Sequence, residues 1–510
     1  MLAKVFSGAV LGIDAYIVEV EIDISNGLPA FTTVGLPEAA VKESRERVKA
    51  AINNSGYYFP YDRITVNLAP ANIRKEGTGY DLPISVGIMA ATNIIPQNII
   101  QDYLLLGELS LDGRIKPVKG SLPMALAAQK SNLKGVIVPK ENSREAAVVN
   151  DISVIPVSHL SDVVGFLRGE KEIEPEYVDI SSIFENNYQD NINFSEVHGQ
   201  EHVKRALEIA AAGGHNVIMI GPPGAGKTML AKRISTILPP ISFEEALETT
   251  KIYSISGLLK SDEALVTERP FRSPHHTISD AGLIGGGQIP KPGEVSLAHN
   301  GVLFLDEIAE FRKNVLEVLR QPIEDKCVSI ARASLSITYP SSFMLVAAMN
   351  PCPCGFLTDP IHECKCSPIQ IHRYRNKISG PLMDRIDLHI EVPAVPYKEL
   401  KYVQTGESSA DIRGRVNNAR QIQTNRYAGS GVYCNAQMSN RHISQHCEMD
   451  ANSHTILEKA IDKLGLSARA YNRILKIART LADMDCQERI QSNHIAEAIQ
   501  YRTLDRSNSF

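Results

Sequence analysis

A glycine-rich segment between an apolar run and a helix-like stretch holds the residues best suited to bind phosphate. Residues 221–228 fit the pattern G-x-x-x-x-G-K-[ST], directly after the apolar run 217–220 and before the helix-like run 229–237. In this pattern, glycines let successive backbone N–H groups face phosphate oxygens at a helix N-terminus. Lys227 would neutralise the β- and γ-phosphates of ATP, and Thr228 would supply a hydroxyl to Mg²⁺. The predicted contacts with the nucleotide are Gly221, Pro222, Pro223, Gly224, Ala225, Gly226, Lys227 and Thr228.

Two carboxylates and an amide end further apolar runs downstream. The run 301–305 is followed by Asp306 and Glu307, and the run 343–349 by Asn350. If these runs are parallel strands, their carboxyl ends meet where ligands of open α/β sheets bind. Asp306 would then hold Mg²⁺ through water, while Glu307 would polarise the attacking water and Asn350 would orient it without adding charge. Together with the glycine-rich segment, these residues predict ATP hydrolysis.

Two arginines follow in the second half of the chain. Arg385 lies in the segment 380–387, and Arg469 opens the helix-like run 467–483. Either guanidinium would stabilise charge on a transferring phosphoryl group. An isolated arginine more often forms a surface salt bridge, but the position of both after the phosphate site, the acid pair and Asn350 favours a catalytic role.

Four of the eight cysteines form two C-x-C pairs within a short loop, Cys352 with Cys354 and Cys364 with Cys366. Four thiolates would close a tetrahedral Zn²⁺ site that pins the loop. Reduced free cysteines and redox-sensitive pairing are the alternatives, and His362 is a substitute ligand. A catalytic metal is not indicated, because nothing in the pattern leaves an open coordination position.

Composition and charge restrict the class of protein. The chain has 510 residues, of which 43% are hydrophobic and 22% charged, as in ordinary soluble globular proteins. The N-terminal residues lack the long apolar core of a signal peptide or membrane span, so a cytoplasmic location is predicted. The formal net charge of -5 gives no global attraction to nucleic acid, so DNA binding would need a local basic surface.

The elements that must position these residues divide the chain into four segments. Residues 1–169 mix strand-like and helical runs, residues 170–193 read as an acidic linker, residues 194–395 alternate strands and helices, and residues 396–510 end in a helical lid. The expected strands are 64–68, 135–138, 216–220, 301–305 and 343–349, and the expected helices are 38–53, 453–464, 467–483 and 493–502. The fold class is therefore α/β with a parallel sheet carrying the phosphate site.

The chain closely resembles the Mg-chelatase-like AAA+ ATPases of the YifB/ComM family over nearly its whole length. The motifs that carry the likeness are residues 197–200, 272–276, 292–301, 350–355 and 467–473. By this resemblance Val197 and Gly199 lie near the adenine. Asn350 is sensor 1, Arg469 is sensor 2, and Arg385 is the arginine finger that reaches the ATP of a neighbouring subunit. The resemblance thus implies a homo-oligomeric ring, a hexamer.

The first segment resembles the Lon protease catalytic fold, which is similar to the second domain of ribosomal protein S5. Residues 106–114 and 136–142 carry this likeness. Gly79 stands where that family has its nucleophilic serine, and Leu122 where it has the activating lysine. Without nucleophile and base, acyl transfer is not available, so the segment is expected to be a scaffold or a DNA-contact module.

The target of the ATPase is the open question. The segment 328–338, with Arg332 near its middle, reads as a β-hairpin, and the insert 268–291 adds Arg272 and Lys291. Repeated around a ring, such residues would build a positive constriction that grips DNA, although scattered charges on solvated loops are the plainer interpretation. The resemblance favours a DNA motor for branch migration in recombination or for uptake of transforming DNA. Remodelling of a protein partner, as in magnesium chelatase, and an orphan or signalling ATPase are the alternatives.

Overall fold

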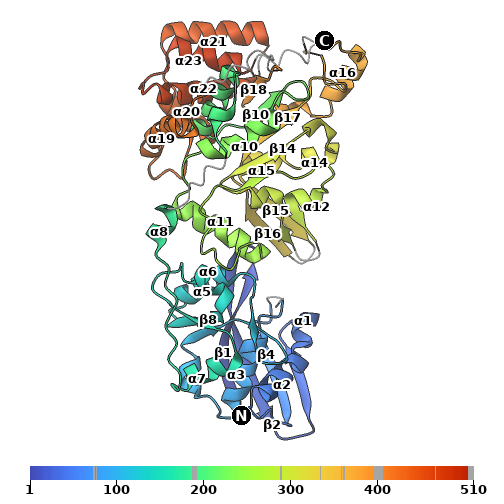
Figure 1. Cartoon of the computed structure of the whole chain (residues 1–510), viewed down its shortest axis with the longest axis vertical. Helices are drawn as coiled ribbons and strands as arrows, with labels where there is room; N and C mark the ends of the chain where they lie inside the picture. Colours follow the sequence, from blue (N-terminus) through green and yellow to red (C-terminus); the bar gives the residue numbers. More distant parts are fainter. Residues whose placement is uncertain are drawn as a thin grey trace. The chain divides into compact units, whose positions relative to one another are not determined.

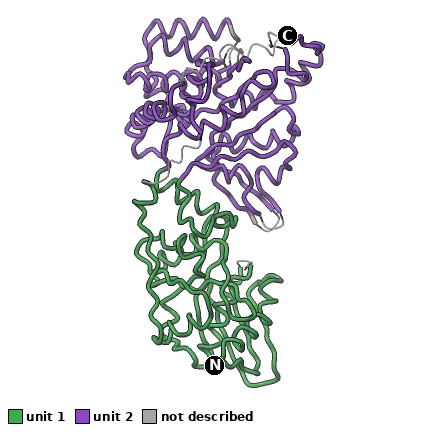
Figure 2. Tube along the Cα trace, in the orientation of Figure 1, with its two compact units in different colours: residues 1–187, 242–267 green, residues 188–241, 268–510 purple. Residues whose placement is uncertain are grey.

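The computed structural model divides the chain into two compact units (Figure 2). It describes residues 1–72, 75, 77–185, 192–287, 290–332, 335–357, 359, 362–394, 406–465 and 467–502. Unit 1 comprises Met1–Asn187 and Ser242–Thr267, and unit 2 comprises Tyr188–Ile241 and Glu268–Phe510. No helix within these described ranges is long and apolar enough to cross a membrane.

Unit 1 is built on a mixed seven-stranded sheet in the order β3-β4-β2-β1-β5-β8-β9. The long hairpin of β1 and β2 alternates buried and exposed side chains, which places one face of the sheet against the core. The strands are β1 (Leu2–Leu11), β2 (Asp14–Ser25), β3 (Ala30–Val34), β4 (Arg63–Ala69), β5 (Tyr103–Leu105), β8 (Gly135–Pro139) and β9 (Ser153–Val157), with a separate pair β6 (Glu108–Leu109) and β7 (Ile115–Lys116).

Helices flank the strands within the first 187 residues of unit 1 (Figure 1). They are α1 (Ala39–Lys42), α2 (Ser44–Asn54), α3 (Asp81–Ala91), α4 (Gln97–Ile100), α5 (Ser121–Lys130), α6 (Ser143–Ala146), α7 (Leu160–Leu167) and α8 (Ile180–Glu185). Every residue of α3 is buried, since the helix packs on β1 and β2. The first part of the predicted acidic linker belongs to this unit: the Glu176 N–H donates to Val154 of β9, and Val178 is buried. Residues 186–191 of that linker lie outside the described residues.

Helix α11 (Phe243–Ser256) belongs to unit 1, although it directly follows the phosphate-site helix in sequence. It packs on α5, and its Phe243 and Leu247 join the apolar cluster around β5 and β8. Its C-terminal end is fixed by the Gly120 N–H, which donates to the Ser254 carbonyl at 3.2 Å. The compact units therefore do not follow the chain order, and the four segment boundaries proposed from the sequence stay predictions.

Unit 2 contains a five-stranded parallel sheet in the order β11-β14-β17-β10-β18. The three runs expected as its strands are confirmed within one residue at each end. The strands are β10 (Val217–Ile220), β11 (Phe271–Arg272), β14 (Val302–Leu305), β17 (Met344–Met349) and β18 (Leu388–Glu391). Because β17 lies between β10 and β14, the ends of these three strands meet at one edge of the sheet.

Helices and two hairpins complete unit 2 (Figure 1). Before its C-terminal region, unit 2 has the helices α9 (Glu201–Gly213), α10 (Lys227–Ile237), α12 (Asp280–Ile284), α13 (Glu294–Leu297), α14 (Lys313–Glu317), α15 (Arg320–Asp325), α16 (Pro368–Arg375) and α17 (Gly380–Met383). One hairpin joins β12 (Gly285–Gly286) to β13 (Lys291–Pro292), and the other joins β15 (Cys327–Arg332) to β16 (Leu335–Pro340). The predicted hairpin is thus confirmed, with residues 333–334 outside the described part.

The C-terminal region is helical, as expected. Its helices are α19 (Ser409–Arg426), α20 (Asn440–His446), α21 (Ala451–Leu464), α22 (Ala468–Met484) and α23 (Ser492–Gln500). Ser467 caps α22 by accepting a hydrogen bond from the Ala470 N–H. The apolar face of α22 shares one continuous core with the sheet and with α9, because Ile474, Ile477 and Leu481 are fully buried there. This packing joins the C-terminal helices to the core of the parallel sheet.

Candidate active site

The glycine-rich loop lies at the carboxyl end of β10, between its neighbours β17 and β18. Gly224 and Gly226 have φ values of +78° and +84°, which glycine adopts without strain. A Cβ on Gly221 would lie 2.1 Å from the Val392 carbonyl oxygen, so a side chain has no room there. Helix α10 begins at Lys227, and its first N–H groups face the loop. This geometry supports the predicted phosphate-binding role.

Lys227 reaches back over the loop. Its Nζ donates to the carbonyl oxygens of Gly221 at 2.7 Å and Pro222 at 2.9 Å, and to Asn350 Oδ1 at 3.1 Å. Burial lowers the pKa of Lys227, and the charges of Asp306 and Glu307 partly oppose that shift. Phosphate oxygens are charged and therefore stronger acceptors than these three neutral ones.

The hydroxyl of Thr228 and the carboxylate of Asp306 lie together. Thr228 Oγ1 donates to Asp306 Oδ2 at 2.7 Å, so the two oxygens predicted to hold Mg²⁺ converge from α10 and β14. Glu307 has φ of +50°, a left-handed conformation that is uncommon for a residue with a side chain, and its side chain is exposed. The Glu307 N–H donates to Asp306 Oδ1 at 3.0 Å. The left-handed turn thus leaves the Glu307 side chain exposed while Asp306 accepts from Thr228.

Asn350 joins the two halves of this arrangement. It follows β17, the central strand, and its amide oxygen accepts from Lys227. The Gly221 N–H also donates to the carbonyl of Met349 at 3.2 Å, so the start of the loop is tied to the end of β17. The structure therefore brings Lys227, Asp306 and Asn350 to one edge of the sheet, as the sequence predicted.

The segment expected near the adenine is joined to the loop by a residue that sequence reasoning left without a role. Val197 is buried and Gly199 has φ of +63°. The next residue, Gln200, is also left-handed, and its Nε2 donates to the carbonyls of Ala225 at 3.1 Å and Pro393 at 2.8 Å. Gln200 thus positions the segment 197–200 against the loop. The only sign of this role in the sequence is that Gln200 belongs to the motif formed by residues 197–200.

Arg385 is buried within its own chain. Its side chain is 5% exposed, and Nη2 lies 2.7 Å from Glu324 Oε1 of α15, while Nη1 donates to the Pro381 carbonyl at 2.5 Å. Neither of these contacts involves the glycine-rich loop of the same subunit. An arginine finger at this position would have to leave Glu324 before it could reach a neighbouring subunit.

Arg469 lies exposed on the first turn of α22. One turn further along the same helix, Arg473 pairs with Asp387, which is 1% exposed and directly precedes β18. Asp387 also accepts from the Asn216 N–H at 2.9 Å and lies 3.7 Å from His215 Nδ1. Sequence reasoning did not single out this pair, which attaches the lid helix to the sheet.

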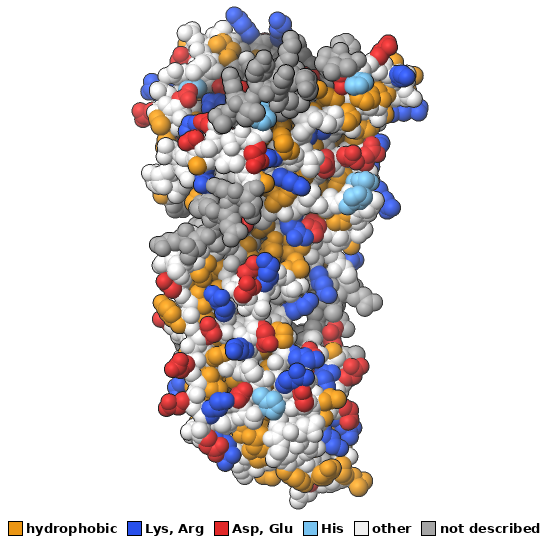
Figure 3. Space-filling model, in the orientation of Figure 1, with side chains coloured by type: hydrophobic (Ala, Val, Ile, Leu, Met, Phe, Trp, Pro, Cys, Tyr) orange, Lys and Arg blue, Asp and Glu red, His pale blue; other side chains and the backbone are white. Residues whose placement is uncertain are grey.

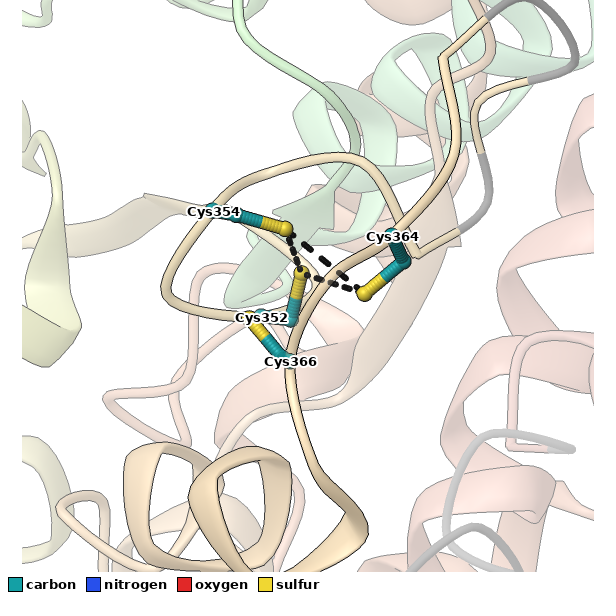
Figure 4. Close-up of side chains that lie close together, drawn as sticks. All are labelled: Cys352, Cys354, Cys364 and Cys366. Atoms are coloured by element: carbon teal, nitrogen blue, oxygen red, sulfur yellow. Dashed lines mark hydrogen bonds between the residues drawn. The ribbon is translucent and has the colours of Figure 1, made fainter.

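The four clustered cysteines come together at the end of β17 (Figure 4). Their sulfur atoms all lie within 4.8 Å of one another, and three pairs are 3.4, 3.7 and 3.6 Å apart. These separations are far longer than a disulfide bond of about 2.05 Å. A backbone hydrogen bond from Phe356 is the main cause that lowers the pKa of Cys354 to about 6, which favours its thiolate form. Desolvation, in contrast, is the main cause that raises the pKa values of Cys352, Cys364 and Cys366. His362 instead lies near Asp359 and stacks on Phe356.

Two of the three basic residues considered for DNA contact lie side by side. Lys291 pairs with Gly286 across the first hairpin, and a Cβ on Gly286 would lie 3.6 Å from Arg332 Nη2. Both basic side chains are exposed. Arg272, in contrast, is held by Glu294 through two hydrogen bonds of 2.7 and 2.8 Å. Over the face seen in Figure 3, basic and acidic side chains are interspersed, so a grip on nucleic acid there would have to be local.

The N-terminal residues compared with a protease dyad do not form one. Leu122 is fully buried in the core of unit 1, and the atom nearest to a Cβ on Gly79 would be Val118 Cγ1 at 3.5 Å. Thr78, beside Gly79, donates to Glu108. No lysine is thus positioned by these contacts to activate a nucleophile.

A parallel sheet of this order, with a glycine-rich loop on one strand and an acid pair and an asparagine on the next two, defines a P-loop protein of the AAA+ class. Comparison with known proteins agrees. The family described as magnesium chelatase, subunit ChlI, matches residues 193–400, its C-terminal region matches residues 406–502, and a further ChlI family matches residues 20–142.

Full-length relatives define the family. The chain is 45% identical to the competence protein ComM of Haemophilus influenzae and 46% identical to the uncharacterized protein YifB of Escherichia coli, covering 99% of this chain and 98% of each relative. It belongs to the YifB/ComM family of Mg-chelatase-like AAA+ proteins. A shorter match of 28% identity to Lon protease 1 of Syntrophobacter fumaroxidans covers 31% of this chain and 20% of that protease, in accordance with the Lon-like N-terminal fold.

Proposed function

We propose that this protein is an ATP-hydrolysing ring motor that acts on DNA. The observation that carries the ATPase assignment is the convergence of Lys227, Asp306 and Asn350 at one edge of the parallel sheet. Glu307 stands next to this group on a turn that exposes its carboxylate.

Each residue has a defined task in this proposal. The loop N–H groups and Lys227 bind the phosphates, and the oxygens of Thr228 and Asp306 fit a hard cation such as Mg²⁺, which would neutralise charge on the phosphates. Glu307 polarises the attacking water, and Asn350 orients it. Val197 and Gly199 border the adenine.

The proposed ring follows from the role given to Arg385. Arg385 acts on the ATP of a neighbouring subunit after it leaves Glu324, and Arg469 of the lid contacts the nucleotide of its own subunit. A finger supplied from outside is an established way to stabilise a phosphoryl-transfer transition state. We infer a homohexamer, which mass photometry with and without ATP would test directly.

The proposal that the motor acts on DNA rests on Arg332 and Lys291. Their exposed side chains lie on two hairpins that pack together, since Tyr339 donates to the Pro290 carbonyl at 2.7 Å and a Cβ on Gly285 would lie 2.8 Å from Ile330. Six copies of this pair would concentrate positive charge in spite of the acidic chain. Arg272 makes a weaker contact candidate because Glu294 already neutralises it. The competence protein among the relatives supports a role in transformation or recombination.

The alternative is an ATP-driven remodeller of a protein partner, which the match to a magnesium chelatase subunit favours. The steady-state ATPase rate with single-stranded, duplex and four-way-junction DNA separates the two. We expect DNA to stimulate the wild-type ATPase rate, and we expect Arg332→Ala to abolish this stimulation. Arg441→Ala, which removes another exposed arginine, is the matched control and should keep it. A rate indifferent to every DNA would overturn the DNA motor and favour the protein remodeller.

We also propose a structural Zn²⁺ at Cys352, Cys354, Cys364 and Cys366. With Zn–S bonds of about 2.3 Å, a tetrahedral site separates its sulfurs by about 3.8 Å, close to the 3.4, 3.7 and 3.6 Å of the three pairs. Elemental analysis of protein purified under reducing conditions should find one zinc per chain. Absence of bound zinc would remove this claim.

A further inference from the structure

The cysteine loop is the direct continuation of the strand that carries Asn350. Cys352 follows Asn350 by two residues and is fully buried, whereas Cys364 and Cys366 lie on the segment that leads into α16 (Figure 4). Arg375 at the end of α16 donates to the Pro351 carbonyl at 3.3 Å. Both pairs of thiols are therefore tied to the backbone immediately after Asn350.

The same loop touches the phosphate site from the other side. A Cβ on Gly355 would lie 2.5 Å from Cδ and 2.6 Å from Cγ of Pro223, the third residue of the glycine-rich loop. Gly355 also has φ of +85°, a conformation that favours glycine. In the sequence, Cys352 and Cys354 thus lie between two residues that contact the nucleotide site, Asn350 before them and Gly355 after them.

A metal at the four sulfurs would join these contacts into one unit. Without the metal, the described contacts that bring Cys352 and Cys354 near Cys364 are weak ones, namely those among the thiols and the ring contact between Phe356 and His362. The position of Gly355 would then be less firmly fixed, because closing a loop without a cross-link costs conformational entropy. A tetrahedral Zn²⁺ removes that freedom, because all four ligands come from the two ends of the loop.

We propose that Zn²⁺ in the cysteine cluster positions the nucleotide site, by holding Asn350 and Gly355 against Lys227 and Pro223 of the phosphate loop. The inference rests on the proposed zinc site and on the proposed ATP site, and adds a coupling between them. Loss of zinc, by chelation or by oxidation of the thiols, therefore weakens nucleotide binding, although no zinc ligand touches the nucleotide.

The test measures zinc content and affinity for a fluorescent ADP analogue on the full chain in reducing buffer with Mg²⁺. Cys364→Ser/Cys366→Ser removes two ligands and should lose zinc and raise Kd at least about tenfold. Gly355→Ala keeps all four thiols, so it should retain zinc and still raise Kd. Cys486→Ser, which removes an exposed thiol outside the cluster, is the matched control and should change neither quantity.

The outcomes are distinguishable. Native affinity in the zinc-free variant, or in Gly355→Ala, overturns the coupling while leaving the zinc site and the ATP site intact. A wild-type chain without zinc overturns the zinc site itself, and with it the coupling. A wild-type chain that contains zinc but does not bind the analogue overturns the ATP site. Circular dichroism of each variant shows whether the change in Kd comes from global unfolding. If the cysteine variant does not fold, removal of zinc from the wild-type chain by chelation decides the matter, and an unchanged Kd then overturns the coupling.

Discussion

Replacement of Arg473 by methionine should destabilise unit 2, because it removes the ion-pair partner of the buried Asp387. Arg473 is the only cation that forms a salt bridge with the buried Asp387 among the described residues, apart from His215 at 3.7 Å. Burial alone would raise the pKa of Asp387, but the charge of Arg473 and then the interactions with His215 and Asn216 outweigh it and hold the pKa well below its usual value. Arg473→Met keeps an unbranched apolar stem and removes the charge.

The size of the effect is bounded in two ways. Breaking a buried ion pair by removing one partner typically costs about 3–5 kcal/mol. Asp387 can limit this cost by taking up a proton, which at pH 7 requires about 4 kcal/mol for a carboxyl of ordinary pKa near 3.9. We therefore expect the free energy of unfolding to fall by about 3–4 kcal/mol at pH 7.

The pH dependence identifies the cause. In the variant the folded state takes up a proton at a higher pH than the unfolded state does, so acid stabilises the variant relative to the wild type. The deficit should shrink as the pH falls from 7 to 5, by at most about 1.4 kcal/mol per unit. In the wild type, Asp387 has a depressed pKa, so its stabilising contribution is present above its unfolded pKa and is lost only at more acidic pH.

Urea unfolding measures both quantities. The chain has no Trp, so Tyr471→Trp on α22 provides a reporter in unit 2 for each background. Arg469→Met on the same helix removes an exposed charge and should change stability by less than about 0.5 kcal/mol. Adding Asp387→Asn to Arg473→Met should recover part of the loss. A deficit below about 1 kcal/mol, or one that does not change between pH 7 and 5, would refute the reasoning.

Two further predictions concern turnover. Lys227→Ala should abolish both nucleotide binding and hydrolysis. Glu307→Gln should abolish hydrolysis and keep nucleotide binding. Normal hydrolysis by Glu307→Gln in a steady-state assay would show that another group polarises the water. Arg385→Ala alone should also be inactive, but mixing it with Glu307→Gln subunits should restore activity, because mixed rings contain sites with an intact Glu307 facing an intact Arg385. Mixtures as inactive as their components would mean that Arg385 does not act between subunits.

The sequence predicted the elements whose residues are strongly apolar. The runs that became β10, β14 and β17 were placed within one residue at each end, and with them the acid pair and Asn350. β11 was missed because it has two residues, and β18 because its apolar residues alternate with His389 and Glu391. Helix α19 was missed because most of its residues are polar and the few buried ones lie along one narrow stripe.

Partners far apart in the sequence set the rest of the site. Nothing near Arg385 indicates that Glu324 would bury its guanidinium, and nothing near Arg473 indicates Asp387. The role of Gln200 depends on two carbonyls, of Ala225 and Pro393, that only the folded chain brings to it. In each case the residue type was visible, whereas its use depends on long-range contacts.

The placement of α11 has a consequence for how the protein can be divided. The chain passes between the units three times, after residues 187, 241 and 267, so a single cut does not separate them. A truncation that starts at residue 188 would leave Phe243 and Leu247 without the apolar cluster that covers them. Helix α11 would then expose apolar side chains, which favours aggregation. A workable ATPase fragment would replace residues 242–267 by a short linker.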